Sequence, residues 1–442
     1  MSQLTRPLTA QLEITDKCNL RCRHCYHLDF NCKRDSKDLP DEQVMLIAAK
    51  LAENHIFSLV ITGGEPLVRK GLTRKLVIYF KEKNIDVSLN TNLQLLDQKT
   101  LDDLIVNHLD GMLISCPSVD PKIYSHMTSG GDFFRFSNNL KMVLERKQHC
   151  SINMVVNRHN LGYIRETAKY MFDLGVEIFG ATPMGMNPQS PDMDNLLTLS
   201  EVRALIEELV WIKENIGLKV DIFEAIPKCA FPSWIRGKDL SFLNRKCQAG
   251  KTIVSIANNG DVRPCSHNPD IYGNILNEEL TAIWQRMDEW RSFQNIPDRC
   301  TTCKIFSNCH GGCRITAKAC TGDCRGEDPW MELPNVSGEW PIKAKSDISL
   351  VPEMTVTFAK VFRWRHENED TYLISSTRNN RNLTAVNGQL FNFVKHLRKI
   401  SPLVLEDLAK SVRCDFADSE FQRVVNLLTT REFISLGRPE RR

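Results

Sequence analysis

The chain has 442 residues, 42% of them hydrophobic and 25% charged, which is the composition of an ordinary globular protein and excludes a disordered one. At this length we expect about three domains, each large enough to bury its own core. The formal net charge of +3 is too small to argue for a nucleic acid or an anionic membrane as a partner. No amino-terminal signal and no apolar run of membrane-spanning length is evident, so we expect a cytoplasmic protein.

Sixteen cysteines occur without a signal segment and with tight local spacings, which favours metal binding over disulfides. Four of them stand alone, and for these we expect a packing role, because isolated cysteines are among the most buried residues. They are Cys32, Cys116, Cys150 and Cys414.

The first cysteine group follows an apolar stretch, residues 8–14, that predicts a strand. Three thiols, Cys18, Cys22 and Cys25, fall in the loop at the end of this strand and are close enough in sequence to share one metal centre. Zinc or an electron-carrying cluster takes four protein ligands, and no fourth cysteine follows at a matching spacing. The pattern therefore indicates an iron–sulfur cluster with one open iron, and a zinc loop is the alternative.

Strand and helix patterns alternate six times up to about residue 200. The later strands are expected at residues 57–61, 86–89, 112–115, 151–156 and 176–181. The helices are expected at residues 41–53, 72–83, 101–106, 136–146 and 164–174. This alternation predicts a parallel sheet with crossover helices, whose ligands bind at the carboxyl ends of the strands. Asn90, Ser115 and the turn Gly63-Gly64-Glu65-Pro66 all fall at such ends.

The cysteine loop C-x3-C-x2-C, with Tyr26 after the last cysteine, and the Gly-Gly-Glu-Pro turn together resemble the radical S-adenosylmethionine (SAM) family over roughly residues 8–183. The resemblance implies a partial (β/α)6 TIM-like barrel within residues 1–217 and a [4Fe-4S] cluster whose open iron chelates SAM. Reductive cleavage of SAM would then give a 5'-deoxyadenosyl radical that abstracts hydrogen from the substrate. The implied cluster ligands are Cys18, Cys22 and Cys25, and the implied SAM contacts are Tyr26, Gly63, Gly64, Glu65, Pro66, Asn90 and Ser115.

The chain departs from the family pattern at one position. Family members often carry an arginine about one helical turn beyond the region matching Ser115, where it pairs with the SAM carboxylate. Here Thr128 stands near that point and Arg135 comes later, so the carboxylate partner stays open. Asn153 and Pro183 are candidates either for lining the cavity or for a structural role at the strand ends.

A second cysteine-rich segment, expected as a domain over residues 218–345, combines C-x-A-G, a hairpin signal at Asn258-Asn259-Gly260, G-x4-C and C-x2-C-x5-C-x3-C. In this order the motifs resemble the SPASM extension of radical SAM enzymes, which houses one or two auxiliary iron–sulfur clusters. The implied ligands are Cys247, Cys265 and Cys313 for the first cluster and Cys300, Cys303 and Cys309 for the second. Cys320 or Cys324 would complete the second cluster, and Cys229, Cys320 or Cys324 would complete the first unless its iron is open. A pair of zinc sites is the alternative.

The tail, residues 346–442, predicts two strands, at residues 355–365 and 371–375, followed by three helices. The helices are expected at residues 387–399, 403–412 and 419–431. A hairpin with three short helices is typical of a winged-helix-like α+β module. It loosely resembles the peptide-recognition element of ribosomal peptide maturation systems, which binds a leader peptide as an added strand. A packing domain is the alternative, and the interleaved acidic residues argue against a nucleic-acid surface.

Together these parts predict a radical SAM/SPASM enzyme that abstracts hydrogen from a ribosomally made precursor peptide, with flavodoxin or ferredoxin as a plausible electron donor. The product would be a carbon–carbon, thioether or ether cross-link. Alternatives are a sulfatase-maturation-like enzyme, weakened because Ser266 replaces the aspartate those relatives carry after the cysteine matching Cys265, and an enzyme acting on small molecules or tetrapyrroles. An iron–sulfur regulator that binds DNA is the alternative of another class. No catalytic residue is assigned, since Glu224 and His267 suit a structural role equally well.

Overall fold

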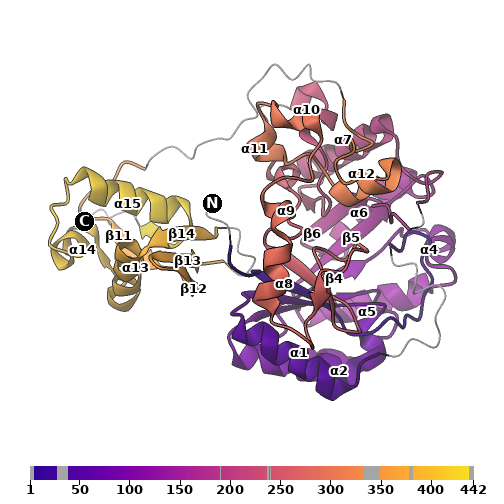
Figure 1. Ribbon diagram of the computed structural model, residues 1–442, viewed down its shortest axis with the longest axis horizontal. Helices are drawn as coiled ribbons and strands as arrows, with labels where there is room; N and C mark the ends of the chain where they lie inside the picture. Colours follow the sequence, from indigo (N-terminus) through magenta and orange to yellow (C-terminus); the bar gives the residue numbers. More distant parts are fainter. Residues whose placement is uncertain are drawn as a thin grey trace. The chain divides into compact units, whose positions relative to one another are not determined.

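The computed structural model describes most of the chain (Figure 1). The described residues are 4–26, 38–189, 191–235, 238, 240–332, 348–377 and 382–437, so Cys32 lies outside them. They form two compact units, one of residues 6–332 and one of residues 4–5 together with residues 348–437. The boundary expected between residues 217 and 218 falls inside the first unit and stays a prediction.

The first unit is built on one ten-stranded sheet with the order β10-β9-β8-β1-β2-β3-β4-β5-β6-β7. Its seven strands from the first part of the chain run parallel to their neighbours. They are β1 (Thr9–Glu13), β2 (Ser58–Thr62), β3 (Asp86–Thr91), β4 (Gly111–Ser115), β5 (Cys150–Val156), β6 (Ile178–Pro183) and β7 (Lys219–Asp221). The predicted α/β partial barrel is therefore confirmed, with β7 as a strand that the periodicity did not predict.

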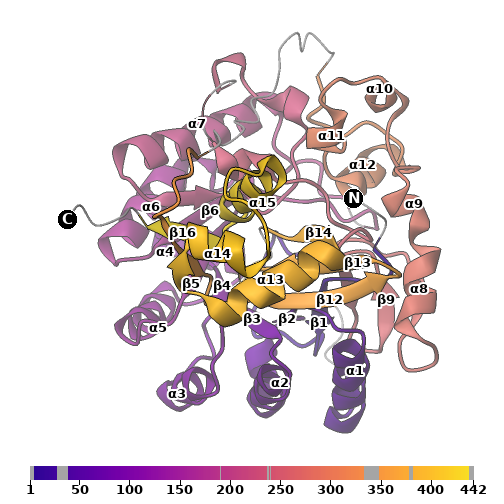
Figure 2. The same ribbon diagram turned by 90° about the vertical axis from the view of Figure 1, so that its left-hand side faces the viewer.

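Helices connect these strands, and Figure 2 shows α1, α2, α3 and α5 in a row along the outside of the sheet. They are α1 (Asp41–Glu53), α2 (Lys70–Glu82), α3 (Gln98–Val106), α4 (Pro121–Thr128), α5 (Phe133–Glu145), α6 (Ile164–Asp173) and α7 (Leu199–Asn215), with short turns η2 (Pro66–Arg69) and η3 (Leu161–Tyr163). The five predicted helices are present, and α4 and α7 are additional. None of the helices in the described residues combines the length and apolarity that a membrane span requires.

The strands alternate between an apolar and a polar face, as β5 illustrates. Ile152 and Met154 are fully buried, whereas Asn153 and Val155 face a pocket on the inner side. Because successive side chains of a strand point to opposite faces, one strand serves both the core under the helices and the ligand site. The polar character of the inner face is thus already present in the strand sequence.

The cysteine-rich segment begins with short turns and then adds three strands to this sheet. The turns are η4 (Lys228–Ala230), η5 (Ser233–Ile235) and η6 (Ser241–Asn244), and the strands are β8 (Ile253–Ile256), β9 (Asp261–Arg263) and β10 (Gly273–Asn274). The predicted hairpin at residues 258–260 joins β8 to β9. Strand β8 also pairs in parallel with β1, Thr9 opposite Ile253, so the hairpin continues the barrel sheet.

Short helices follow the hairpin and carry Cys300, Cys309 and Cys320. They are α8 (Leu280–Arg286), α9 (Asp288–Arg291), α10 (Asp298–Thr301), α11 (Phe306–Cys309) and α12 (Arg314–Thr321). Gly250 shows why this part needs glycine: it has a φ of +59°, and a Cβ there would lie 2.8 Å from Cβ of Trp290. The tight turn after Cys247 therefore packs directly against α9.

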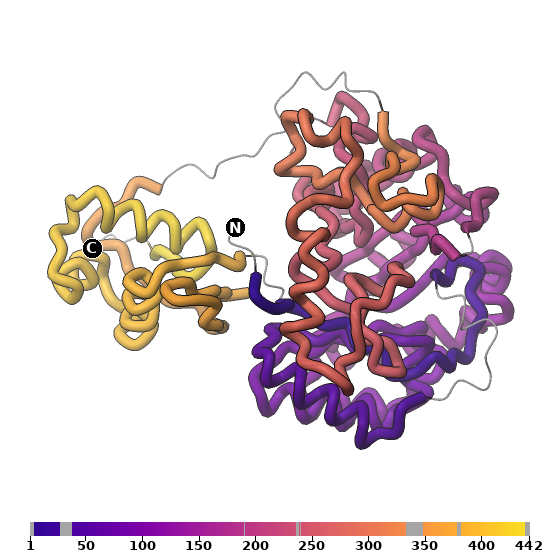
Figure 3. Tube along the Cα trace, viewed as in Figure 1, coloured from indigo at the N-terminus to yellow at the C-terminus, as the bar shows by residue number. Residues whose placement is uncertain are grey.

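The second unit is an α+β module, drawn in orange and yellow in Figure 3. Its two three-stranded sheets have the orders β15-β11-β16 and β12-β13-β14. The strands are β11 (Thr355–Phe358), β12 (Arg363–Asn368), β13 (Thr371–Ser375), β14 (Thr384–Asn387), β15 (Leu403–Val404) and β16 (Ile434–Gly437), and the helices are α13 (Gly388–Ile400), α14 (Leu405–Ser411) and α15 (Ser419–Thr430). The three predicted helices are present, but the single strand expected at residues 355–365 is divided between the two sheets.

Two details of the second unit differ from the sequence-based expectations. Cys414 is exposed rather than packed, because it follows α14 in a turn outside the apolar cluster. Thr5, far from this unit in sequence, joins it: its backbone N–H and its hydroxyl donate to Glu367 at 2.5 and 2.9 Å. Glu367 in turn pairs with buried Arg365 at 2.8 Å, so Thr5 is held against β12.

Candidate active site

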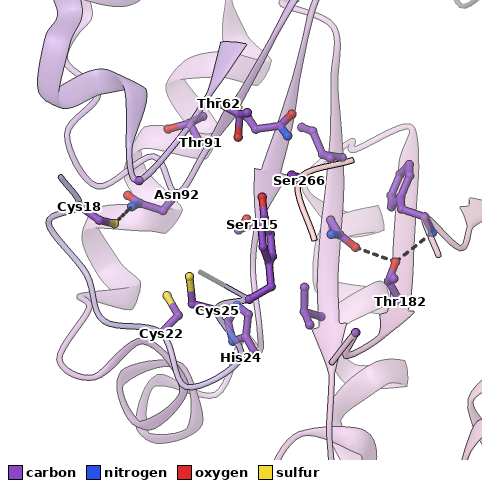
Figure 4. Close-up of a pocket in the computed structure, with 18 of the residues that line it drawn as sticks. Cys18, Cys22, His24, Cys25, Thr62, Thr91, Asn92, Ser115, Thr182 and Ser266 are labelled. Atoms are coloured by element: carbon purple, nitrogen blue, oxygen red, sulfur yellow. Dashed lines mark hydrogen bonds between the residues drawn. The ribbon is translucent and has the colours of Figure 1, made fainter. Parts of the chain in front are cut away.

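A pocket of about 300 Å³ lies at the carboxyl ends of the parallel strands (Figure 4). Polar side chains from six strands, β1 to β6, and from the residue after β3 line it, namely Gln11, Thr62, Asn90, Thr91, Asn92, Ser115, Asn153 and Thr182. The three thiols of the loop after β1, Cys18, Cys22 and Cys25, line the same space. Of the predicted SAM contacts, Tyr26, Gly63, Gly64, Glu65, Asn90 and Ser115 line it, as do Asn153 and Pro183. Pro66 instead begins η2 and is buried.

The Gly-Gly turn holds the cysteine loop directly. The N–H of Gly64 donates to the carbonyl of Thr15 at 2.7 Å, and the N–H of Glu65 donates to the carbonyl of Lys17 at 2.9 Å. A Cβ on Gly63 would lie 2.5 Å from the Thr15 oxygen, and one on Gly64 would lie 2.2 Å from the Lys17 oxygen. The sequence suggested that these glycines admit a ligand. The structure shows that they admit the backbone of the cysteine loop.

Glu65 is buried and joins three segments through its carboxylate. It accepts hydrogen bonds from the N–H of Leu67 at 3.1 Å, the hydroxyl of Thr91 at 2.8 Å and the N–H of Asn92 at 2.8 Å. Burial raises its pKa to about 7, although these donors act to lower it. Asn92 continues the network by donating to Asn19 in the cysteine loop at 3.0 Å. Glu65 therefore fixes the end of β3 against the loop.

The other side of the cysteine loop rests on the carboxyl end of α4. The N–H of Arg21 donates to the carbonyl of Thr128 at 3.3 Å, and the N–H of Arg23 donates to that of Met127 at 2.9 Å. These carbonyls belong to the last turn of a helix and have no partner within it, so the loop satisfies them. Thr128 itself is buried and donates its hydroxyl to Tyr124 at 2.7 Å, which places it outside the pocket lining.

The three thiols form a donor set suited to an iron–sulfur cluster. Burial raises the pKa of Cys18 to about 12, with further contributions from Glu65 and Cys25. Burial also raises the pKa of Cys22, and nearby Cys25 and Cys18 add to it. Because neighbouring thiolates repel one another, these three are stable as thiolates only when bound iron ions supply positive charge. The thiols border a shared space (Figure 4), and no three metal-binding side chains of the described residues lie close enough to hold a single ion.

Two buried polar atoms of the pocket residues have no hydrogen-bond partner among the described residues. They are Oε1 of Gln11 and Nδ1 of His24. Burial lowers the pKa of His24 to about 4, so its ring is neutral at pH 7 and offers one acceptor nitrogen. Leaving such atoms unsatisfied costs about 1–3 kcal/mol each. A polar ligand with amino and hydroxyl donors, such as SAM, fits this requirement.

Arg21 is the single arginine or lysine among the described residues that line the pocket. Arg135, the arginine that the sequence offered for a SAM carboxylate, is exposed on α5 and is absent from that lining. The sequence pattern did not identify Arg21 as a ligand-binding residue, because a basic residue at this place in the cysteine motif does not by itself indicate a function. Its position makes it the better candidate for binding a carboxylate in this pocket.

Residues of the cysteine-rich segment close the pocket opposite the strands. The rings of Tyr26 and His267 lie 4.1 Å apart, centroid to centroid. Nδ1 of His267 is 3.9 Å from Oε2 of Glu224, and Ser266 hydrogen-bonds to the Tyr26 side chain. Glu224, Ser266 and His267 all line the pocket. Tyr26, the residue after the last cysteine of the loop, therefore contacts the cysteine-rich segment directly.

The six cysteines expected to bind the auxiliary clusters fall into two neighbourhoods. Cys265 and Cys313 each lie within electrostatic range of Cys247 and of Glu224. Cys300 lies within range of Cys303 and Cys309. The expected ligands of the two auxiliary clusters thus occupy two separate places, with Glu224 shared between the first of them and the pocket. Of the isolated cysteines in the described residues, Cys116 and Cys150 are buried.

Comparison with known proteins agrees with this geometry. The Radical SAM superfamily matches residues 12–171, and the iron–sulfur cluster-binding domain SPASM matches residues 247–310. A PqqA peptide cyclase of Bradyrhizobium diazoefficiens is 24% identical over 343 residues, which are 74% of this chain and 86% of that protein. The mycofactocin maturase MftC of Mycolicibacterium smegmatis is 28% identical over 336 residues, 74% of this chain and 83% of that protein.

Among solved structures, SuiB of Streptococcus suis bound to S-adenosylmethionine matches with a TM-score of 0.61 and 21% identity, covering 75% of this chain and 78% of SuiB. The barrel, the cysteine loop and the superfamily match define a radical SAM enzyme. More particularly, the chain contains a radical SAM domain and a SPASM domain, and its cofactors are SAM, a [4Fe-4S] cluster and auxiliary iron–sulfur clusters. The structural likeness to SuiB supports the fold.

Proposed function

We propose that this enzyme modifies a ribosomally made precursor peptide and introduces a carbon–carbon, thioether or ether cross-link. The two relatives above are named as a peptide cyclase and a maturase, and SuiB has been crystallised with the precursor peptide SuiA. The observation that carries the proposal is the composition of the pocket, which is lined both by the cysteine loop and by Glu224, Ser266 and His267. A carboxylate, a hydroxyl and an imidazole suit the N–H and C=O groups of a peptide.

In this proposal Cys18, Cys22 and Cys25 hold the cluster, while Gln11 and His24 offer their unsatisfied atoms to SAM. When bound, cluster and SAM supply a carbon radical that removes a hydrogen atom from a C–H bond that no side-chain base could deprotonate. Glu224 and His267 would orient the peptide so that one C–H bond points at the cysteine loop. An electron donor such as flavodoxin or ferredoxin and a cytoplasmic location belong to the same proposal.

To test it, the anaerobically reconstituted enzyme is reduced in the presence of SAM and a leader-bearing peptide. We expect deoxyadenosine and a peptide lighter by two hydrogens. One hydrogen atom goes to the deoxyadenosyl radical, and the other is lost as a proton and an electron, with an oxidised auxiliary cluster as the electron acceptor. Cys22→Ala should form neither product, and Cys414→Ala, at an exposed site of the other unit, should form both. Turnover of a small molecule with no change in any precursor peptide would reject peptide maturation.

We further propose that the second unit binds the leader part of the peptide. Supporting this, β12 is an outer strand of its described sheet, and its Trp364 is 46% exposed. The Trp364 ring lies 4.9 Å from that of Phe391, and Nζ of Lys395 lies 5.6 Å from it. An exposed aromatic beside a cation is typical of a binding surface.

The leader proposal is tested by measuring peptide affinity with labelled precursor. Trp364→Ala should weaken binding by roughly tenfold, since a buried aromatic anchor contributes about 1–2 kcal/mol or more. Val106→Ala, which changes another exposed apolar side chain on α3, is the matched control and should bind as the parent does. Equal affinity of both variants would place the leader site elsewhere.

A further inference from the structure

The dense cysteine run is the C-x2-C-x5-C-x3-C segment, residues 300–313. Three of its thiols lie together, but a [4Fe-4S] cluster with no open iron needs four thiolates. Cys300, Cys303 and Cys309 supply three. The sequence pattern offered Cys320 or Cys324 for the fourth place, because both follow the run along the chain. A different cysteine, far earlier in the chain, lies at this site in the structure.

Cys229 is brought there by the turn η4. The backbone N–H of Lys228, the preceding residue, donates to Sγ of Cys309 at 3.2 Å. Because consecutive Cα atoms are 3.8 Å apart, the Cys229 side chain begins within about 9 Å of that sulfur. Cys309 acts electrostatically on Cys229, and Cys229 acts on Cys300 together with Cys303 and Cys309. Four thiols from two distant segments therefore share one neighbourhood.

The packing around Cys229 holds this arrangement in place. A Cβ on Gly312 would lie 2.9 Å from Cδ of Pro227, and one on Gly311 would lie 3.5 Å from Sγ of Cys300. The Gly311-Gly312 pair thus lets the Pro227 segment approach the dense cysteine run. On its other side, η4 is anchored to α7 by Arg203, whose Nε donates to the carbonyl of Ala230 at 2.8 Å.

The charges and hydrogen bonds at this place suit a cluster. Lys228 is 1% exposed, and both Lys228 and Lys246 lie within electrostatic range of Cys309. The backbone N–H of Glu332 donates to the sulfur of Cys229. A cluster with four thiolates carries net negative charge, so nearby ammonium groups and N–H donors to sulfur stabilise it.

The alternative cysteines share charged neighbours with this site, since Arg314 acts on both Cys300 and Cys324 and Asp328 acts on both Cys229 and Cys320. No thiol is among the main groups that act on Cys320 or Cys324. The charged groups that act on Cys324 are Lys318, Asp270, Arg314 and Asp323. The one that acts on Cys320 is Asp328. For Cys265 and Cys313, of the first auxiliary set, they are Cys247 and Glu224. Among the cysteines of the described residues that lie outside residues 300–313, Cys229 is thus the one near Cys300 and Cys309.

We propose that Cys229, Cys300, Cys303 and Cys309 together hold one auxiliary [4Fe-4S] cluster, and that Cys320 and Cys324 are not its ligands. Each thiol would lose its proton on binding and occupy one iron, so that this cluster has no open corner. The proposal does not depend on the substrate, since it concerns ligation alone.

The test counts iron and sulfide in the anaerobically reconstituted full chain. A parent variant with Cys18→Ala, Cys22→Ala and Cys25→Ala leaves the auxiliary clusters as the metal present. Adding Cys229→Ala should remove up to about four iron atoms per chain or change the electron paramagnetic resonance spectrum of one reduced cluster. Adding Cys320→Ala or Cys324→Ala should leave unchanged the resonance signal that Cys229→Ala removes or shifts.

Cys229→Ser serves as the second variant, because serine keeps the size of the side chain and can still offer an oxygen ligand. We expect it to retain iron with a shifted resonance spectrum, while its circular dichroism matches the parent. Unchanged iron content and an unchanged spectrum in Cys229→Ser would overturn the proposal. Loss or shift of the same signal in the Cys320 or Cys324 variants would overturn it as well.

Discussion

Gly64 shows at the level of one residue how the cysteine loop is built. Its N–H binds the loop, and its missing side chain leaves the space that the Lys17 carbonyl occupies. Glu65, the next residue, joins the loop network to β3 through Asn92. The motif therefore holds the cysteine loop in place, and its contact with SAM stays a prediction.

Gly64→Ala should disturb the cluster loop, because its Cβ would meet backbone atoms that cannot move aside. We expect a loss of stability of about 1–3 kcal/mol and a lower occupancy of iron at the amino-terminal site. Gly71→Ala is the matched control, since nothing lies within 4 Å of its added Cβ. Iron content and thermal unfolding of both proteins are the measurements, and equal values would contradict this role of Gly64.

Arg21→Gln should weaken SAM binding by roughly tenfold, as expected when a charge-assisted hydrogen bond worth about 1.5–3 kcal/mol is lost. Arg135→Gln should leave binding unchanged, because Arg135 is exposed and outside the pocket lining. Equilibrium dialysis with the reconstituted protein gives both affinities. A larger effect from Arg135 would make Arg135 the carboxylate partner that the sequence left open.

At the level of elements, the junction of β1 with β8 and β9 is the main feature of the first unit. Glu13 of β1 and Arg263 of β9 form an ion pair whose side chains are 1% and 12% exposed. Ser255 of β8 also donates to Glu13, at 3.2 Å. The pair therefore joins the barrel to the hairpin that carries Cys265 and the pocket residue Ser266.

Arg263→Met should destabilise the first unit by about 3–5 kcal/mol, because it removes the cation from a buried carboxylate. Glu13→Gln combined with Arg263→Met should cost less than the sum of the two single changes. Arg423→Met, which breaks an exposed pair with Glu420 on α15, is the control and should leave unfolding unchanged. If the loss of stability in the double variant equals the sum of the losses in the two single variants, the interaction between Glu13 and Arg263 contributes nothing to stability.

At the scale of the whole molecule, the chain consists of two units with separate cores. The second unit has its own apolar cluster, which includes Val356, Ile374, Val394 and Leu405. The cysteines predicted to bind iron all lie in the first unit. Metal binding should therefore couple to the folding of one unit and leave the other unaffected.

Removal of iron by a chelator should speed amide hydrogen exchange in residues 18–26 and 298–324 and leave exchange in residues 355–437 as it was. The reason is that the first two segments lose their cross-links, whereas the second unit keeps its core. Mass spectrometry of peptic fragments resolves these regions. Uniformly faster exchange would mean that the two units fold as one.

The sequence by itself determined the fold class, the strands β1 to β6, five of the barrel helices and the cysteine loop, because these depend on local periodicity and spacing. Tertiary structure decided the pairing of Thr9 with Ile253, the role of Gly64, the place of Arg21 and the neighbourhood of Cys229. Each of these joins residues that the chain keeps apart, and a one-dimensional pattern cannot say which distant backbones will meet. Contacts between remote segments follow from the packing of the whole sheet, which no local motif contains.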